Sequence, residues 1–119
     1  SVQGPVTVAL APGDVVVVPF PYSDVLAEKK RPALVVSSPS LEKNHGIVWL
    51  AMITSASRQW RGDVRVADLT AAGLPTQCSV RVAKIATVSV ARVDRKIGAL
   101  DPTDWKAVRT GLARYSAAR

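Results

Sequence analysis

The chain has 119 residues, of which 48% are hydrophobic, and it carries 16 basic against 9 acidic residues, a formal net charge of +7. The length predicts one domain with a single core, and the charge indicates an anionic partner such as nucleic acid or an acidic protein segment. No apolar run approaches the about 20 residues of a membrane-spanning helix. No strongly basic amphipathic helix stands apart from a core-facing one either, so no membrane partner is expected, and the first residues resemble no secretory signal.

The single cysteine and the single histidine limit the possible chemistry. Cys78 excludes an intramolecular disulfide and favours a reducing cytoplasm, and its place at the start of an apolar run predicts a buried thiol. His45 lies in a predicted turn, where it cannot complete a Ser-His-Asp triad or a two-histidine ribonuclease site. Because clusters of His and Cys are absent from the sequence, neither a metal nor another cofactor is expected.

The predicted elements are mostly short strands. Residues 1–12 are expected to be a flexible lead-in and residues 13–119 a single domain. Four consecutive valines, Val15 to Val18, predict a strand buried on both faces, which ends at Pro19. Further strands are predicted from apolar runs and alternation at residues 33–37, 47–53, 63–66 and 79–88, with a short strand in 90–97. Residues 38–46 between them are predicted to be turns.

The strand predicted at residues 79–88 alternates, which places Val80, Val82 and Ile85 inward and Arg81 and Lys84 at the surface. Residues 67–73 form one predicted helical turn closed by glycine. The last element is a helix with Asp101 as N-cap and Pro102 at its first position. Its apolar face comprises Trp105, Val108, Leu112 and Tyr115. The elements predict a small, mainly β protein with an antiparallel, strongly bent sheet or barrel and a C-terminal helix packed on it.

Three adjacent cations, Lys29, Lys30 and Arg31, precede Pro32 and the second predicted strand. The proline biases Arg31 toward an extended backbone. Arg31 is therefore expected at the start of a strand, where a rigid element can hold its side chain toward a cleft. The alternative is that the three cations belong to an ordinary solvated loop.

The order of these segments resembles the MazF/PemK family of bacterial type II toxin–antitoxin toxins. The resemblance covers about residues 12–116, and its motifs are Gly13-Asp14 before the valine strand, Arg31-Pro32-Ala33 at the next strand start, Thr54-Ser55 at a strand end, and Ser79 to Val82 before Lys84-Ile85. It implies a small SH3-like β-barrel of the CcdB/PemK kind, with five to seven antiparallel strands and a C-terminal helix. It also implies a cytoplasmic toxin that is usually a homodimer. Such a toxin inhibits growth because it is a metal-independent, sequence-selective endoribonuclease that cleaves single-stranded RNA. An acidic antitoxin is expected to neutralise it.

The resemblance also implies catalytic residues. Arg31 matches the family's strand-start arginine, and its planar, permanently charged fork suits a phosphate that gains negative charge. Thr54 matches the strand-end threonine and would position the phosphate, with Ser55 in support. Arg81 matches an arginine that some members use on a later strand. Those members carry an aspartate two residues further on as a proposed general base, whereas this chain has Ala83.

The general base therefore stays open at this point. The chain could use Arg31 and Thr54 alone, recruit Asp24 or Glu28 from the preceding loop, or cleave slowly. Aromatic and basic residues near these motifs are candidates for RNA binding. Phe20, Tyr22 and Trp60 could stack on unpaired bases, and phosphate contacts are expected from Lys29, Lys30, Arg58 and Arg61.

Three alternatives remain in the sequence. Trp60 is equally well interpreted as a partly buried or dimer-interface aromatic. The same superfamily includes toxins that act on DNA gyrase, although such toxins do not need the Arg31–Thr54 pair. Finally, Ala83 is compatible with a catalytically weak module that keeps the fold and binds its antitoxin.

Overall fold

Six antiparallel strands form one sheet in the part of the chain described by this computed structural model, residues 10–19 and 29–117. The strands are β1 (Asp14–Pro19), β2 (Lys30–Val35), β3 (Ile47–Thr54), β4 (Val64–Arg65), β5 (Ser79–Ser89) and β6 (Arg95–Ala99). The helices are α1 (Pro39–His45), α2 (Leu69–Ala72) and α3 (Pro102–Tyr115), with a 3₁₀ turn η1 (Val90–Arg92). The strand order is β4-β5-β3-β2-β1-β6.

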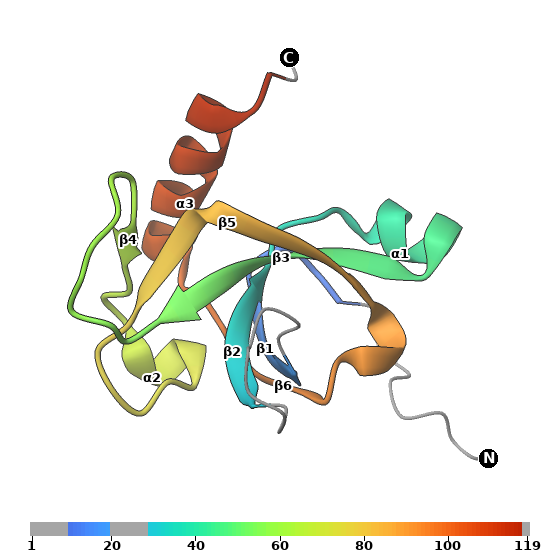
Figure 1. Cartoon of the computed structure of the whole chain (residues 1–119), viewed down its shortest axis with the longest axis horizontal. Helices are drawn as coiled ribbons and strands as arrows, with labels where there is room; N and C mark the ends of the chain where they lie inside the picture. Colours follow the sequence, from blue (N-terminus) through green and yellow to red (C-terminus); the bar gives the residue numbers. More distant parts are fainter. Residues whose placement is uncertain (1–9, 20–28, 118–119) are drawn as a thin grey trace.

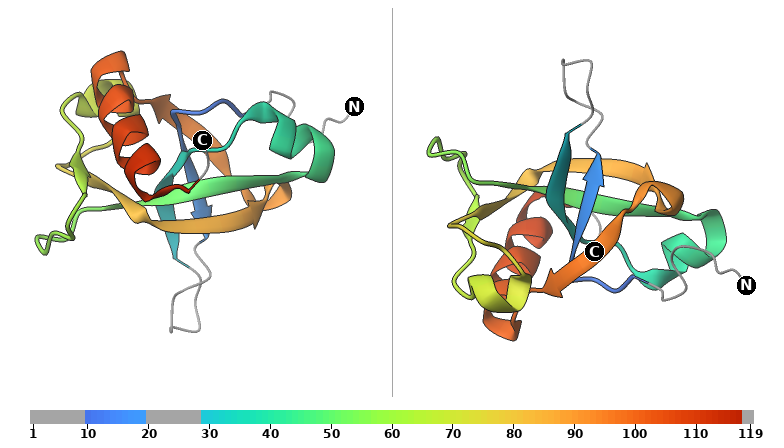
Figure 2. Two further views of the ribbon diagram at one scale, coloured as in Figure 1. Left: turned by 90° about the horizontal axis from the view of Figure 1, so that it is seen from above. Right: turned by 90° about the horizontal axis from the view of Figure 1, so that it is seen from below.

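The sheet is strongly bent and curls into a half-barrel. β1 and β2 run steeply across β3 and β5 in both views of Figure 2, and α3 lies beside β4 and β5 (Figure 1). The register of β3 against β5 shifts between Ala51 and Met52, whose partners are Ile85 and Arg81. Such an irregularity bends the strands that carry it. The predicted fold class, a mainly β, SH3-like barrel type with a C-terminal helix, is confirmed.

The core lies on both faces of the sheet, as the four valines predicted. Val15 packs with Leu34 and Val108 of α3 on one face, whereas Val16 and Val18 pack with residues of β2, β3 and β5 on the other. Burial of apolar surface on both sides fixes the central strands firmly. The site residues described below stand at the ends of these strands.

Helix α3 begins as predicted. The Asp101 side chain accepts from the backbone N–H of Asp104 at 2.8 Å, and Pro102 occupies the first turn. The buried Asp104 carboxylate in turn accepts from the backbone N–H groups of Ala67 (3.1 Å) and Asp68 (3.0 Å). The start of α3 thereby holds the segment that leads into α2. Tyr115 departs from the predicted apolar face, because its side chain is exposed.

Residues 38–46 contain a helix where turns were predicted. Helix α1 starts with Pro39 and ends with His45, and Gly46 follows with a left-handed φ of +68°. Proline in the first turn and a left-handed glycine after the last residue are ordinary helix boundaries. The helix was missed because it is short and none of its residues is buried, so no apolar periodicity marks it.

Three other predictions need correction. The first is the short strand predicted in residues 90–97. Its later part is confirmed by β6, but residues 90–92 form the 3₁₀ turn η1, where the Ser89 hydroxyl accepts from the N–H of Ala91. Ile85 is exposed rather than inward, because its strand is interrupted by the register shift. β2 begins at Lys30 rather than at residue 33, since Lys30 and Arg31 pair with β1.

The one-turn helix α2 and its closing Gly73 are confirmed. Within residues 10–19 and 29–117, no helix combines the length and the apolar character that crossing a membrane would require.

Candidate active site

Arg31 and Thr54 lie at the same end of two neighbouring strands. The antiparallel pairing of β2 with β3 stops at Ala33 and Met52. Arg31 precedes Ala33 by two residues and Thr54 follows Met52 by two, so both lie just beyond the last pair. Arg31 is still paired with Val18 of β1 on its other side. The sheet therefore gives the arginine a fixed backbone while its side chain is exposed.

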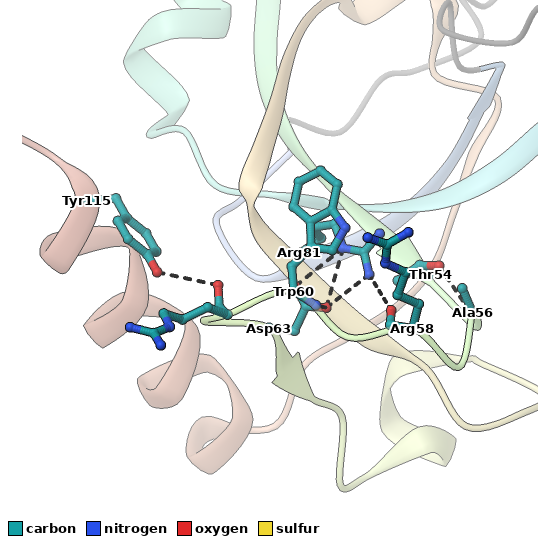
Figure 3. Close-up of polar contacts among 8 residues, drawn as sticks. Thr54, Ala56, Arg58, Trp60, Asp63, Arg81 and Tyr115 are labelled. Atoms are coloured by element: carbon teal, nitrogen blue, oxygen red, sulfur yellow. Dashed lines mark hydrogen bonds and ion pairs between the residues drawn. The ribbon is translucent and has the colours of Figure 1, made fainter.

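The Thr54 hydroxyl is oriented by a local hydrogen bond. Its oxygen accepts from the backbone N–H of Ala56 at 3.0 Å, as Figure 3 shows. A hydroxyl that accepts in this way can still donate its own hydrogen elsewhere. Thr54 and Ser55 line a pocket of 410 Å³ whose wall also includes Ser57, Gln59 and Gln77. Hydroxyl and amide donors of this kind suit an anionic oxygen.

Arg65, a residue that the sequence did not single out, lines the same pocket. Ser79 of β5 pairs with Thr54 of β3 on one side and with Arg65 of β4 on the other. The three residues form a row across three strands, and directly opposite residues share a face of the sheet. The alternation of residues 63–66 marks Arg65 as a surface residue, but only the strand order places it beside Thr54.

Arg31 lines a second pocket, of 520 Å³, together with Lys30 and Arg95. Asp94 connects two of these cations: its carboxylate lies 3.4 Å from Lys30 Nζ and accepts from Arg95 Nη1 at 2.8 Å. The structure thus places Arg31 beside Lys30, as the sequence indicates, and beside Arg95, which the sequence did not single out. Arg31 and Thr54 line separate pockets rather than one shared pocket.

Arg81 is buried, with 8% of its surface exposed, so the prediction of a surface position is wrong. Its Nε lies 3.3 Å from both oxygens of Asp63, and its Nη2 donates to Asp63 Oδ2 at 3.1 Å and to the carbonyl of Arg58 at 2.8 Å. The guanidinium carbon also lies 4.3 Å from the ring centroid of Trp60, a cation–π contact. Arg81 therefore holds the loop that follows β3.

This loop, residues 58–63, closes on itself. The N–H of Trp60 donates to Asp63 Oδ2 at 2.9 Å, and the N–H of Asp63 donates to the carbonyl of Trp60 at 3.1 Å. The Tyr115 hydroxyl of α3 donates to the carbonyl of Arg61 at 3.4 Å (Figure 3). The loop brings together three of the predicted RNA-binding residues, all exposed: Arg58, Trp60 and Arg61.

None of the described residues that line the two pockets is a carboxylate. Ala83, which stands where some relatives of the resembled family carry an aspartate, is exposed on β5. Asp24 and Glu28, the two alternative bases, lie outside the described residues.

Of the remaining residues predicted to contact RNA, some lie within the described residues and others outside them. Phe20 and Tyr22 lie outside the described residues, and Lys29 is exposed immediately before β2. Over the described ranges, no group of three or more His, Cys, Asp or Glu side chains could hold a metal ion.

Cys78 is buried, as predicted, at the wall of the Thr54 pocket. Burial raises the pKa of its thiol, and a hydrogen bond with the Thr76 side chain acts in the opposite direction. A raised pKa disfavours the thiolate, so Cys78 is a poor nucleophile. His45 is exposed at the end of α1 and lines neither of the two pockets.

Comparison with known proteins gives one family and one fold. Residues 11–115 match the family model described as PemK-like, MazF-like toxin of type II toxin–antitoxin systems. No curated protein sequence matches. A mycobacterial endoribonuclease in complex with its cognate antitoxin superposes with a TM-score of 0.72 at 20% identity, over 89% of this chain and 93% of that one.

Two further solved structures have the same fold. MazF from Deinococcus radiodurans has a TM-score of 0.70 at 18% identity, covering 90% of this chain and 96% of its own. The Mycobacterium tuberculosis toxin MazF-mt6 has a TM-score of 0.69 at 21% identity, covering 85% and 93%.

Proposed function

Since the chain belongs to the PemK-like, MazF-like toxins of type II toxin–antitoxin systems, we propose that it is an endoribonuclease that cleaves single-stranded RNA without a metal ion. The observation that supports this proposal is the position of Arg31 and Thr54 at one end of the adjoining strands β2 and β3. A protein of the same fold is a mycobacterial endoribonuclease.

In the proposed reaction, the 2′-oxygen of a ribose attacks the adjacent phosphorus and the bond from phosphorus to the 5′-oxygen breaks. The 2′-hydroxyl gives its proton to water or to the carboxylate of Asp24 or Glu28, the departing 5′-oxygen gains a proton, and a 2′,3′-cyclic phosphate remains. Arg31 stabilises the extra charge on the phosphate oxygens and can protonate the leaving oxygen. The O–H of Thr54 donates to a phosphate oxygen, with Ser55 as a second donor. An RNA strand across the end of the β2–β3 pair would contact both pockets.

Arg81 has an indirect role in this proposal. Its guanidinium is held by Asp63 and by the carbonyl of Arg58, which leaves it poorly placed to contact a phosphate. It acts by supporting the loop that carries Arg58, Trp60 and Arg61, which with Lys29 and Lys30 would bind the RNA on either side of the scissile phosphate. Phe20 and Tyr22 are proposed as further base contacts.

We also propose a cytoplasmic homodimer whose sequence-selective cleavage inhibits growth, and which is neutralised by an acidic antitoxin. The net charge of +7 supports both an RNA substrate and an acidic partner. A catalytically weak, antitoxin-binding module is the second candidate. The exposed Ala83 and the engaged Arg81 favour it, because neither position supplies a free acid or base.

The test is incubation of the purified protein with a long unstructured RNA in EDTA, followed by mapping of the new 5′ ends. We expect discrete cuts, and Arg31→Ala should reduce their rate by about 10²–10³-fold, as for loss of one preorganised charge contact. Arg109→Ala, on the exposed face of α3, removes the same charge elsewhere and should cleave normally. No cutting at high protein concentration refutes the nuclease, and inhibition of DNA supercoiling would instead indicate a gyrase-directed toxin.

A further inference from the structure

We propose that Trp60 is a preformed stacking platform for one unpaired RNA base, and that Asp63 and Arg81 are the residues that position it. This inference rests on the proposed RNA substrate and adds a specific contact to it. Trp60 remains 41% exposed although its backbone N–H and its carbonyl are both hydrogen-bonded to Asp63. An exposed indole on a fixed backbone suits a flat ligand.

The loop geometry fixes the backbone that carries the indole in three ways. Reciprocal hydrogen bonds between Trp60 and Asp63 close the turn. Gly62 supplies a left-handed φ of +91°, and a Cβ at this position would lie 2.6 Å from the Tyr115 hydroxyl, so α3 packs closely against the turn. The hydrogen bond from Arg81 to the carbonyl of Arg58 holds the start of the loop.

Arg81 also determines which side of the indole is available. Its guanidinium carbon lies 4.3 Å from the centroid of the indole ring, and Figure 3 shows the guanidinium beside that ring, so a base would have to stack from the other side. Arg81 is itself held in place by Asp63, whose side chain is only 2% exposed. A base on the opposite face of the indole would complete a column of guanidinium, indole and base.

The surroundings favour RNA over another flat ligand. Arg58 and Arg61 flank Trp60 and are both exposed, so phosphates on either side of a stacked base would meet cations. Gln59, the residue before Trp60, lines the pocket that contains Thr54 and Ser55. The platform is therefore continuous in the chain with the residues proposed to hold the scissile phosphate, and it would hold the base of a nucleotide near the cut.

The proposal is tested by binding of 2′-O-methyl RNA 12-mers (A, C and U homopolymers and a random pool), which lack the attacking hydroxyl and so report binding without cleavage. Trp60→Ala should weaken binding about 5- to 150-fold, the usual effect of losing one stacked base, whereas Trp60→Phe should recover most of it. The slope of log K against log salt should stay unchanged in Trp60→Ala, because no phosphate contact is lost. Trp49→Phe, an exposed tryptophan on β3, is the matched control and should bind normally.

Tryptophan fluorescence gives the readout for the two positioning residues. RNA should quench Trp60 in the wild type and in Trp49→Phe, and Asp63→Asn should reduce both the quenching and the affinity while shifting the emission to the red. Three results would each overturn the platform. They are equal RNA binding by Trp60→Ala and the wild type, no binding of any RNA oligomer, and quenching by a poly-glutamate peptide that equals the quenching by RNA. Normal cleavage by Trp60→Ala would overturn the platform and leave the proposed nuclease activity intact. Quenching by RNA without any cleavage would instead overturn the nuclease activity and leave the platform intact.

Discussion

The buried ion pair between Asp63 and Arg81 should be among the most sensitive polar contacts in the described structure. The two side chains are 2% and 10% exposed and their closest N–O distance is 3.1 Å. Removing one partner of such a pair leaves an uncompensated buried charge and typically costs about 3–5 kcal/mol. Arg81→Met keeps most of the apolar stem, so we expect a loss of about 3 kcal/mol, which includes the cation–π contact with Trp60. Asp63→Asn keeps an acceptor oxygen and should cost about 2 kcal/mol.

The double variant is the decisive measurement. If the charges act as a unit, Asp63→Asn combined with Arg81→Met should lose clearly less than the sum of the single losses, with a coupling of about 2 kcal/mol. Urea unfolding, followed by far-UV circular dichroism, gives the three free energies, and equal m-values would show that the same surface unfolds in each variant.

The matched control is the pair Arg95–Asp94. Its N–O distance of 2.8 Å is shorter, but its side chains are 63% and 34% exposed, so Arg95→Met should change the stability by less than about 1 kcal/mol. The reasoning would be refuted by additive losses in the double variant, or by an equal loss for Arg95→Met, since either would mean that burial does not determine the strength of these pairs.

Two further predictions concern stability and reactivity. Asp104→Ala should destabilise the protein by about 2–4 kcal/mol in the same urea assay, because the backbone N–H groups of Ala67 and Asp68 lose a buried acceptor. Asp101→Ala removes only the N-cap of α3 and should cost about 1 kcal/mol. An equal loss of stability in both variants would contradict the argument. Cys78 should react with iodoacetamide at pH 8 roughly tenfold or more slowly than in the urea-unfolded chain, because burial and the raised pKa both lower the accessible thiolate; equal rates by mass spectrometry would show that the thiol is open.

The sequence was most informative where one local rule determined the structure. The valine run predicted burial on both faces, and Val15 and Val16 do pack into opposite cores. The helix α3 could be placed by Asp101 and Pro102, since N-cap chemistry is read within a few residues. Neither prediction depends on how distant parts of the chain come together.

The site depended on contacts that alternation cannot show. Arg81 was expected at the surface because it alternates with Val80 and Val82, yet the register shift of β3 and Asp63 on the following loop together bury it. Arg65 reaches the Thr54 pocket only because β5 lies between β3 and β4. Strand order and register are set by the whole sheet, so a linear pattern carries no direct record of them.

The distribution of acidic groups bears on the chemistry of the site. Two of the nine acidic residues, Asp24 and Glu28, lie outside the described ranges. Each of the others accepts from a backbone N–H or pairs with a cation: Asp14, Glu42, Asp63, Asp68, Asp94, Asp101 and Asp104. None of them lines either pocket.

These carboxylates therefore stabilise the fold. Asp94 pairs with Lys30 and Arg95, which leaves Arg31 and Arg65 as the pocket arginines placed to meet an anionic ligand. A carboxylate in either pocket would cancel part of the field that a phosphate needs in the transition state. In the proposed nuclease, the described residues then act mainly in two ways: arginine stabilises the charge on the phosphate, and Thr54 hydrogen-bonds to a phosphate oxygen. A carboxylate base would have to come from Asp24 or Glu28, which makes Asp24→Asn and Glu28→Gln the substitutions that separate proton removal from charge stabilisation.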